Sequence, residues 1–337
     1  MKILKCTSPH QFEYGEMNEP ELKEGHAIIK INRIGICGTD LHAFEGTQPF
    51  FTYPRILGHE LAGELVDFDN APGFQKGEAV SIMPYFYCGD CIACRNGKPN
   101  CCANIHVFGV HIDGGMKEYI SVPAQYLLHG EGLSFDELAL VEPLAIGAHG
   151  VWRAEVKQGD FVLVIGAGPI GLGTMEFARI AGGKVIVLDI NETRLDFCKN
   201  KLNVHAAINA SSTNVTNQLL EITNGDMPTK VIDATGNLRA INNAINYLAH
   251  GGNYVLIGLQ KEPFSFSHPE FHKRETTLMS SRNATVKDFQ HVITSMKAGL
   301  VDPKTYITHR FEFSELKDNF ESLLNPANGV IKAMVNL

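Results

Sequence analysis

Short apolar runs separated by Gly and Pro fill the first part of the chain, up to about residue 145. The pattern predicts strands over residues 26–34, 60–68, 79–83 and 116–122. Several short strands that share one core favour a partly closed β-barrel. The character of the sequence changes near Leu144.

From residue 160 onward, apolar strands alternate with helical segments. We expect strands over residues 161–165, 184–189, 230–233 and 253–257, and helices over residues 169–181, 191–201, 238–248 and 286–298. Such alternation predicts a doubly wound parallel sheet with helices on both faces. The fold class is therefore α/β, with residues 1–145 in a barrel domain and residues 146–285 in the parallel-sheet domain. We expect residues 286–337 to return to the barrel domain.

Length and composition agree with a two-domain globular protein. The chain has 337 residues, of which 44% are hydrophobic and 20% charged, and its net charge is −8 without long charged runs. Because no basic stripe is present, we expect no nucleic-acid partner. Because no apolar run approaches the ~20 residues of a membrane helix and no secretory signal is visible, we expect a cytoplasmic protein without membrane contact.

A glycine-rich string, Gly166-Ala167-Gly168-Pro169-Ile170-Gly171, follows a predicted strand and opens a predicted helix. In a dinucleotide site Gly166 would form the tight turn, Gly168 would let the backbone approach a pyrophosphate, and Gly171 would let helix and strand pack closely. Asp189 lies 18 residues after Gly171, at the end of the next predicted strand. A carboxylate there accepts ribose hydroxyls and repels a 2′-phosphate, which favours NAD over NADP. The alternative is an ordinary turn with a helix-capping Asp.

Five of the eight cysteines lie between residues 88 and 102. Cys88, Cys91, Cys94 and Cys102 follow a Cys-x2-Cys-x2-Cys-x7-Cys pattern, which is typical of a closed tetrahedral zinc site. A site with four sulfur ligands has no open position, so we expect a structural zinc in a lobe of about residues 84–104. Cys101 is an alternative to Cys102 as a ligand, and the other interpretation is a cluster of free buried thiols.

A second set of potential zinc ligands is dispersed: Cys37, His59, Glu60 and Glu142. Their residue types suit zinc, but their separation along the chain gives no support. Residue chemistry alone favours a buried thiol at Cys37 and a core histidine at His59.

Taken together, these motifs resemble the zinc-containing medium-chain dehydrogenases, the family of alcohol, sorbitol and threonine dehydrogenases. The resemblance covers nearly the whole chain and is carried by residues 35–40, 58–60, 142–144 and 166–171 and by the four-cysteine lobe. It implies a GroES-like β-barrel catalytic domain and a Rossmann domain. It also implies an NAD oxidoreductase with two Zn²⁺ per chain, one catalytic and one structural.

The resemblance assigns the catalytic zinc to Cys37 and His59, with Glu60 and Glu142 as carboxylates that complete or approach its coordination. Since Cys37 and one Glu already neutralise the metal, we expect the two glutamates to exchange with water or substrate rather than bind together. Asp40 resembles the carboxylate that holds the imidazole of a liganding histidine.

The same resemblance implies a proton relay from the substrate hydroxyl through Thr39 to His42. Zinc would lower the pKa of the hydroxyl, and the zinc alkoxide would release a hydride to NAD. The alternative for His42 is an ordinary surface histidine. The positions that resemble pyrophosphate and adenosine contacts are Ile170, Asp189 and Arg194, and those beside the nicotinamide are Ile257, Gly258 and Leu259.

Residues 53–55 and 269–285 resemble, within this family, bacterial sugar-acid dehydrogenases. The implied substrate is a small polyhydroxylated molecule, and we expect oxidation of L-galactonate at C5 to D-tagaturonate. Arg282 is the candidate partner of the substrate carboxylate, because Arg binds carboxylates with two parallel hydrogen bonds. A salt bridge between domains or subunits is the alternative for Arg282.

Other interpretations of the whole chain are a threonine, sorbitol or galactitol dehydrogenase and a catalytically silent, zinc-stabilised binding protein. The family resemblance also implies a homo-oligomer, a dimer or a tetramer.

Overall fold

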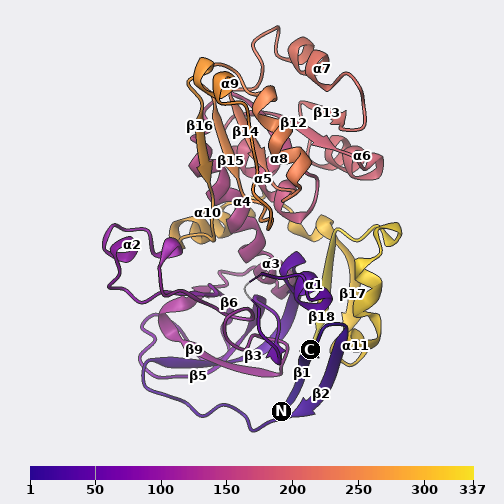
Figure 1. The fold of residues 1–337 in the computed structure, drawn as a ribbon. Coiled ribbons are helices and arrows are strands. Elements are labelled where there is room, and N and C mark those ends of the chain that lie inside the picture. Colours follow the sequence, from indigo (N-terminus) through magenta and orange to yellow (C-terminus); the bar gives the residue numbers. More distant parts are fainter. Residues whose placement is uncertain (50) are drawn as a thin grey trace. The chain divides into compact units, whose positions relative to one another are not determined.

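The computed structural model describes residues 1–49 and 51–337. It contains two compact units (Figure 1). The first unit combines Met1–Pro143 with Thr285–Leu337, and the second is the continuous segment Leu144–Ala284.

The described part of the first unit, residues 1–49, 51–143 and 285–337, forms three sheets. The largest has the order β10-β6-β5-β3-β18-β17, with β9 also paired to β3, and a smaller one has the order β2-β1-β4. Its strands are β1 (Lys2–Ser8), β2 (Gln11–Glu16), β3 (His26–Ile36), β4 (Arg55–Ile56), β5 (Glu60–Phe68), β6 (Ala79–Ile82), β7 (Tyr85–Phe86), β8 (His106–Val107), β9 (Tyr119–Pro123), β10 (Leu127–His129), β17 (Ile307–Glu312) and β18 (Lys332–Asn336). The short strands β7 and β8 pair with each other.

The core of the first unit comes from alternating apolar positions on β3, β5 and β9, whose inward side chains include Ile29, Leu65 and Ile120. Alternation places every second side chain on the same face of a strand. The last strand, β18, pairs antiparallel with β3, so the C-terminal segment completes the sheet that the N-terminal segment begins. This return of the chain carries one buried charge, Lys332, into the unit.

Among the residues that the structure describes, the helices that lie wholly in the first unit are α1 (Gly38–Glu45), α2 (Ile92–Arg95), α3 (Phe135–Ala139), α10 (Val286–Lys297) and α11 (Leu316–Asn319). A further helix, α4 (Val141–Ala154), begins here and continues into the second unit. The capping of α1 is relevant to the site below, because Cys37 is its N-cap and Asp40 lies in its first turn. Asp40 accepts a hydrogen bond from the Cys37 N–H, which ties the start of the helix together.

The second unit is built on a six-stranded parallel sheet of order β13-β12-β11-β14-β15-β16. Its strands are β11 (Phe161–Ile165), β12 (Lys184–Asp189), β13 (Ala206–Asn209), β14 (Lys230–Asp233), β15 (Asn253–Leu256) and β16 (Thr277–Ser280). The helices are α5 (Pro169–Ile180), α6 (Glu192–Lys201), α7 (Val215–Ile222), α8 (Leu238–Ala244) and α9 (His268–Lys273). The predicted α/β fold, with a GroES-like barrel and a Rossmann-type sheet, is confirmed.

The strand order reverses between β11 and β14. From β11 the chain runs outward through β12 to β13 on one side, and from β14 it runs outward through β15 to β16 on the other. Because parallel crossovers are right-handed, α5 and α8 cover opposite faces of the sheet. Ligands of open α/β sheets bind at the carboxyl ends of the strands beside such a reversal.

Several predicted boundaries shift in the structure. The strand expected over residues 116–122 begins at Tyr119, because the backbone of Met116 pairs with Leu57 and Leu4 instead. The helix expected over residues 238–248 ends at Ala244 and continues as a single 3₁₀ turn, Ile245–Tyr247, the usual way in which a helix end tightens. Further 3₁₀ turns are Pro99–Cys101, Ala124–Tyr126, Pro303–Tyr306, Phe313–Glu315, Phe320–Leu324 and Pro326–Asn328.

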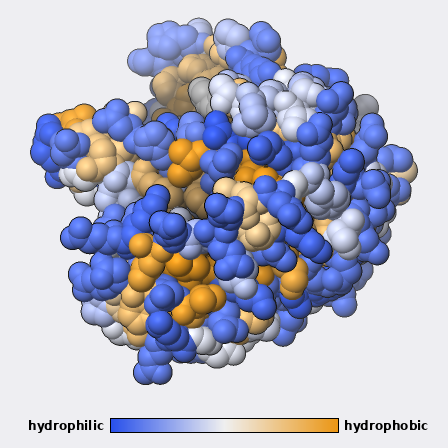
Figure 2. Space-filling model, turned by 90° about the horizontal axis from the view of Figure 1, so that it is seen from below, coloured by the Kyte–Doolittle hydropathy of each residue, from blue (hydrophilic) through white to orange (hydrophobic). Residues whose placement is uncertain are grey.

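Within the described ranges, every helix is too short or too polar to cross a membrane. The face seen from below carries hydrophilic side chains over most of its area, with hydrophobic ones between them (Figure 2).

Candidate metal centres and dinucleotide site

Three of the dispersed ligand candidates come together in the first unit. Cys37 follows β3, while His59 and Glu60 stand at the start of β5, and antiparallel pairing of the two strands sets Gly35 opposite Glu60. One ligand atom from each of Cys37, His59 and Glu60 lies within 4.8 Å of the other two. His59 and Glu60 are buried and Cys37 is partly buried. The fold thus assembles a thiol, an imidazole and a carboxylate that can hold one metal ion.

Gly35 makes room for the carboxylate of this group. A Cβ atom at position 35 would lie 2.1 Å from Oε2 of Glu60. Any side chain at position 35 would displace Glu60. Steric space for the Glu60 carboxylate therefore explains why a glycine occurs in this strand, which the hydrophobic pattern does not reveal.

Asp40 holds the chain segments that carry the ligand candidates Cys37 and His59. Its two carboxylate oxygens accept hydrogen bonds from the N–H of Cys37, at 2.9 Å, and of Gly58, at 3.1 Å. Oδ1 also lies 3.7 Å from Nδ1 of His59. Burial lowers the pKa of the His59 imidazole, but the charges of Asp40 and Cys37 raise it well above its ordinary value. One buried carboxylate therefore fixes the two chain segments that carry Cys37 and His59.

Sequence reasoning missed Lys332, which forms a buried ion pair with Glu60. The Lys332 ammonium donates to both oxygens of Glu60, at 2.6 and 2.7 Å, and to the Ile36 carbonyl at 3.1 Å. Burial lowers the pKa of Lys332, but Glu60 and Cys37 raise it above its ordinary value. The sequence feature that could have indicated this ion pair is a lysine inside the apolar run at residues 330–335.

Tyr85 is the second residue that the sequence did not point to. Its hydroxyl donates a hydrogen bond to Oε1 of Glu142, and both residues are buried. Burial raises the pKa of Glu142 to about 7, although the neighbouring His59 lowers it. Glu142 does not join the group of Cys37, His59 and Glu60 that lies within 4.8 Å. No periodicity or motif marks a tyrosine for this contact.

The charges of this buried cluster fit a divalent cation. Asp40, Glu60 and Glu142 are three buried carboxylates next to the Cys37 thiol, and Lys332 is the buried ammonium among them. Negative charge raises the pKa of His59 against the effect of burial, whereas burial and then the charge of Glu60 raise the pKa of Glu142. A metal ion would displace those protons and compensate the same charge.

Thr39 and His42 occupy α1, three residues apart. Thr39 is partly buried, and within residues 1–49 and 51–337 its hydroxyl makes no hydrogen bond to another side chain. His42 is exposed, and its Nδ1 lies 3.3 Å from both Glu45 Oε2 and Thr47 Oγ1. The imidazole is therefore accessible to solvent, whereas Thr39 lies between it and Cys37 along the chain.

The predicted lobe also forms as one cluster. The sulfurs of Cys88, Cys91, Cys94 and Cys102 all lie within 4.8 Å of one another, and the pairs Cys91–Cys94 and Cys88–Cys102 are 3.5 Å apart. A tetrahedron with Zn–S bonds of about 2.3 Å requires sulfur separations of about 3.8 Å. The four-thiol geometry thus fits a zinc ion, and the exposed Cys101 lies outside the group.

Backbone N–H groups stabilise part of this lobe as thiolates. Donors from Ala103 and Cys94 lower the pKa of Cys91 to about 6, whereas burial and the neighbouring Cys91 thiol raise the pKa of Cys94 to about 12. The N–H groups of Cys88 and Asn104 each lie 3.3 Å from the sulfur of Cys102. Such donors stabilise the anionic form of sulfur that binds a metal.

In the second unit, the glycine-rich turn lies where the strand order reverses. Gly166 follows β11 with φ of 100°, a conformation that L side chains rarely adopt. A Cβ at Gly171 would lie 1.9 Å from the Gly166 carbonyl oxygen, so only glycine permits this close packing. Gly168 is the N-cap of α5 and Pro169 occupies its first turn, which leaves the helix N-terminus open towards an anion.

Asp189 ends β12 beside that turn. Its Oδ2 accepts from the Ala167 N–H at 2.6 Å, and its Oδ1 accepts from the Asn191 N–H at 2.8 Å. These two bonds fix the carboxylate while each oxygen keeps a further lone pair for a ligand hydroxyl. Arg194, in the first turns of α6, lies near Gly168, since its Nη1 is 4.0 Å from a Cβ built there.

The remaining predicted positions of this unit lie at the ends of β15 and β16. Ile257, Gly258 and Leu259 follow β15, and Leu259 is exposed. Gly258 packs against the turn after β14, since a Cβ there would lie 2.1 Å from the Gly236 nitrogen. Arg282 follows β16 and is exposed, next to the buried Ser281.

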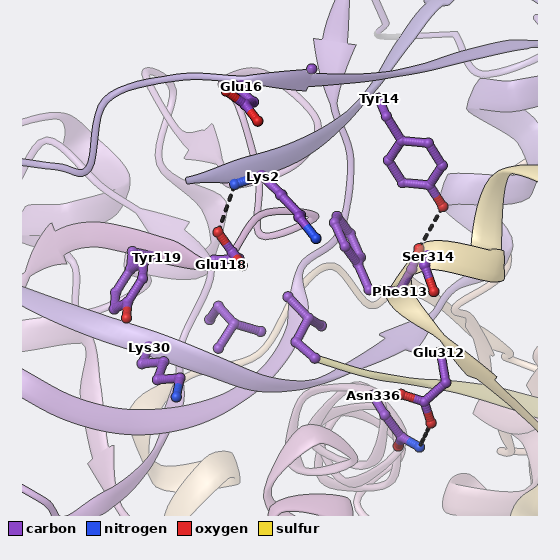
Figure 3. Close-up of a pocket in the computed structure, with 13 residues that line it drawn as sticks. Lys2, Tyr14, Glu16, Lys30, Glu118, Tyr119, Glu312, Phe313, Ser314 and Asn336 are labelled. Atoms are coloured by element: carbon purple, nitrogen blue, oxygen red, sulfur yellow. Dashed lines mark hydrogen bonds between the residues drawn. The ribbon is translucent and has the colours of Figure 1, made fainter.

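A cavity of about 720 Å³ opens elsewhere in the first unit (Figure 3). Its polar groups bond to one another: Tyr14 Oη donates to the Phe313 carbonyl at 2.5 Å, and the Lys2 N–H donates to Glu118 at 2.6 Å. None of the residues that line it belongs to either metal cluster. The predicted chemistry therefore does not fall in this cavity.

Two protein-family models match the chain. Residues 23–131 match the alcohol dehydrogenase GroES-like domain, and residues 169–298 match the zinc-binding dehydrogenase model. These ranges fall in the barrel-containing unit and mostly in the parallel-sheet unit, respectively.

Individual proteins are similar over nearly the whole chain. L-galactonate-5-dehydrogenase of Escherichia coli (strain K12) is 42% identical over 99% of this chain and 98% of its own length. Sorbitol dehydrogenase of Halalkalibacterium halodurans is 30% identical over 94% of each chain. The crystal structure of an alcohol dehydrogenase from Escherichia coli CFT073, complexed with NADH, superimposes with a TM-score of 0.93 at 32% identity and covers 100% of this chain and 99% of that chain.

The chain belongs to the zinc-binding, GroES-like alcohol dehydrogenase family. It is a medium-chain dehydrogenase, and among its full-length relatives are sugar-acid and polyol dehydrogenases. The resemblance of the sequence to the zinc-containing medium-chain dehydrogenases is confirmed. The interpretation as a zinc-stabilised protein without catalysis is set aside, because this is a family of enzymes and the described residues retain both potential metal clusters.

Proposed function

We propose that this enzyme oxidises a secondary alcohol of a sugar acid with NAD as the hydride acceptor. The first candidate reaction is the conversion of L-galactonate to D-tagaturonate at C5. The observation that carries the chemistry is the buried group of Cys37, His59 and Glu60, which offers three protein ligands of the kind that catalytic zinc uses. The 42% identity with an L-galactonate-5-dehydrogenase over 99% of the chain supports the substrate.

The protein residues hold the metal and shape its surroundings. Cys37, His59 and one of the glutamates Glu60 and Glu142 are the proposed ligands of the catalytic zinc, and Asp40 orients the imidazole of His59. When bound, zinc supplies a Lewis acid that lowers the pKa of a substrate hydroxyl. Cys88, Cys91, Cys94 and Cys102 hold the structural zinc of the lobe.

Thr39 and His42 are the proposed path for the proton of the substrate hydroxyl. Residues three apart on a helix are neighbours on its surface, so a hydroxyl at Thr39 and an imidazole at His42 face the same side of α1. The exposure of His42 suits its release of a proton to solvent, and an imidazole exchanges protons near neutral pH.

The glycine-rich turn, together with Ile170, Arg194 and residues 257–259, is the proposed NAD site. Asp189 should decide against NADP, because its fixed carboxylate would repel a 2′-phosphate. Replacement of Asp189 by Ser should narrow the ratio of kcat/KM between NAD and NADP, and equal use of both cofactors by the unmodified enzyme would contradict the role of Asp189.

Arg282 is the proposed partner of the substrate carboxylate. Arg282→Ala should raise KM for L-galactonate and lower kcat/KM by about ten- to hundredfold, the value of one charged hydrogen-bonding pair. The matching uncharged alditol should lose much less. An equal loss on both substrates would show that Arg282 binds hydroxyls or cofactor rather than a carboxylate.

A neutral polyol is the second candidate substrate, because a sorbitol dehydrogenase is 30% identical over 94% of the chain. Threonine and galactitol are further candidate substrates within the same chemistry. Purified enzyme should be assayed with NAD against L-galactonate, related hexonates, alditols and threonine, with NADH absorbance as the readout. Turnover of L-galactonate well above that of the others supports the proposal, and preference for an alditol or threonine overturns the substrate assignment.

The proposal includes a homo-oligomer, dimer or tetramer, in the cytoplasm. The cytoplasm suits the clustered cysteines, since thiols that remain reduced are available as metal ligands. Sedimentation analysis of the purified enzyme tests the assembly.

A further inference from the structure

Two glutamates share the buried cluster but are held by different partners. Glu60 receives both of its hydrogen bonds at 2.6 and 2.7 Å from the Lys332 ammonium. Glu142 accepts instead from the neutral hydroxyl of Tyr85. The two carboxylates are therefore distinct in charge environment although both are buried in the same cluster.

They also differ in their distance from the other ligand candidates. Glu60 belongs to the group within 4.8 Å that includes Cys37 and His59, and Glu142 does not. A catalytic zinc keeps three protein ligands and one open position, and Cys37, His59 and Glu60 are sufficient for the three. A fourth protein ligand would close the site.

Glu142 is the group able to close it. A buried carboxylate beside a metal ion is a strong ligand, and the buried Lys332 ammonium offsets part of the negative charge that Glu142 would add to that of Cys37, Glu60 and Asp40. The hydrogen bond from Tyr85 is the contact of Glu142 that opposes this movement.

The Tyr85 hydroxyl is itself held in place. Its ring is buried and packs edge-on against Phe289 of α10, with ring centroids 6.0 Å apart. Phe289 is completely buried, so the tyrosine side chain has little room to follow a moving carboxylate.

We propose that Tyr85 is a positioning residue whose hydroxyl holds Glu142 away from the metal and so keeps the fourth coordination position open for the substrate hydroxyl. This inference rests on the proposed catalytic metal centre of Cys37, His59 and Glu60.

The test compares Tyr85→Phe with the unmodified enzyme. Loss of the hydroxyl should release Glu142 to the metal. The affinity of the buried site for Zn²⁺, measured by chelator competition with a Cys37→Ser variant as the baseline for the lobe, should rise about tenfold. The visible absorption of the Co²⁺-substituted site should change, and KM for the alcohol should rise more than kcat falls.

Two further variants control the experiment. In Tyr85→Phe/Glu142→Gln the competing carboxylate is absent, so the Zn²⁺ affinity should return to that of Glu142→Gln alone. Tyr126→Phe removes another buried tyrosine hydroxyl, one that bonds to the backbone of Tyr87, and should leave the Zn²⁺ affinity and the Co²⁺ spectrum unchanged.

The possible results distinguish failure of the role of Tyr85 from failure of the proposed catalytic centre. Unchanged Zn²⁺ affinity in Tyr85→Phe overturns the inference, and so does reduced affinity, because reduced affinity would mean that the Tyr85–Glu142 pair already binds the metal. If the unmodified protein bound only the zinc of the lobe, the proposed catalytic centre itself would fail, which is a separate result.

Discussion

The two metal clusters of the first unit are built in opposite ways. The lobe takes its four ligands from the 15 residues between Cys88 and Cys102, and its ligands are mostly exposed or partly buried. The buried cluster takes Cys37 from the residue after β3, His59 and Glu60 from the start of β5, and Lys332 from the last strand, β18. Local sequence defines the first cluster, whereas the complete fold defines the second.

This contrast indicates that the metal ions of the two clusters have different functions. Four thiolates leave no open coordination position and supply no proton donor or acceptor, so the lobe suits a structural ion. The buried cluster has mixed ligands, surplus carboxylates and a supporting Asp40, which suits an ion whose coordination must change during turnover. Loss of one metal should therefore affect catalysis, and loss of the other should affect stability.

The largest expected effect is that of Cys37→Ser on turnover. Removal of the thiolate should lower kcat/KM at least about a thousandfold, which corresponds to about 4 kcal/mol, while the protein stays folded. Zinc analysis should give one ion per chain. Retention of both ions with full activity would remove Cys37 from the metal site.

Asp40→Asn should have a smaller effect that is confined to the buried cluster. An amide can accept only one of the hydrogen bonds that the two oxygens of Asp40 now accept from Cys37 and Gly58. The Zn²⁺ affinity of the buried site should fall about ten- to hundredfold, as chelator competition would measure. An equal loss of affinity at the lobe would indicate general destabilisation instead.

Separate replacement of the adjacent residues Cys101 and Cys102 should show which of the two binds the zinc ion of the lobe. Cys102→Ser should remove one zinc and lower the free energy of unfolding by on the order of 4 kcal/mol, because a closed site contributes folding energy directly. Cys101→Ser, the matched control, should change neither zinc content nor thermal stability. The reverse pattern would make Cys101 the ligand.

Much of this arrangement could be predicted from local sequence. The strands Phe161–Ile165, Lys184–Asp189 and Lys230–Asp233 follow directly from short apolar runs, and the lobe follows from cysteine spacing alone. Buried parallel strands are continuous apolar runs, so their limits are sharp in the sequence.

The buried cluster required more than local sequence. Residue chemistry favoured a core histidine at His59, and only family resemblance joined it to Cys37. Lys332 and Tyr85 were missed because their partners, Glu60 and Glu142, lie 272 and 57 residues away. Such contacts depend on strand pairing over the whole unit, which periodicity does not encode.

Stepwise zinc addition to zinc-free enzyme tests the central claim that one ion stabilises and the other catalyses. Thermal stability and the formation of NADH from L-galactonate should be followed together against the amount of zinc added. Stability should return with one equivalent of zinc per chain and activity with the other, and Cys37→Ser should show only the recovery of stability. Recovery of stability and activity in a single step at one equivalent would contradict this claim.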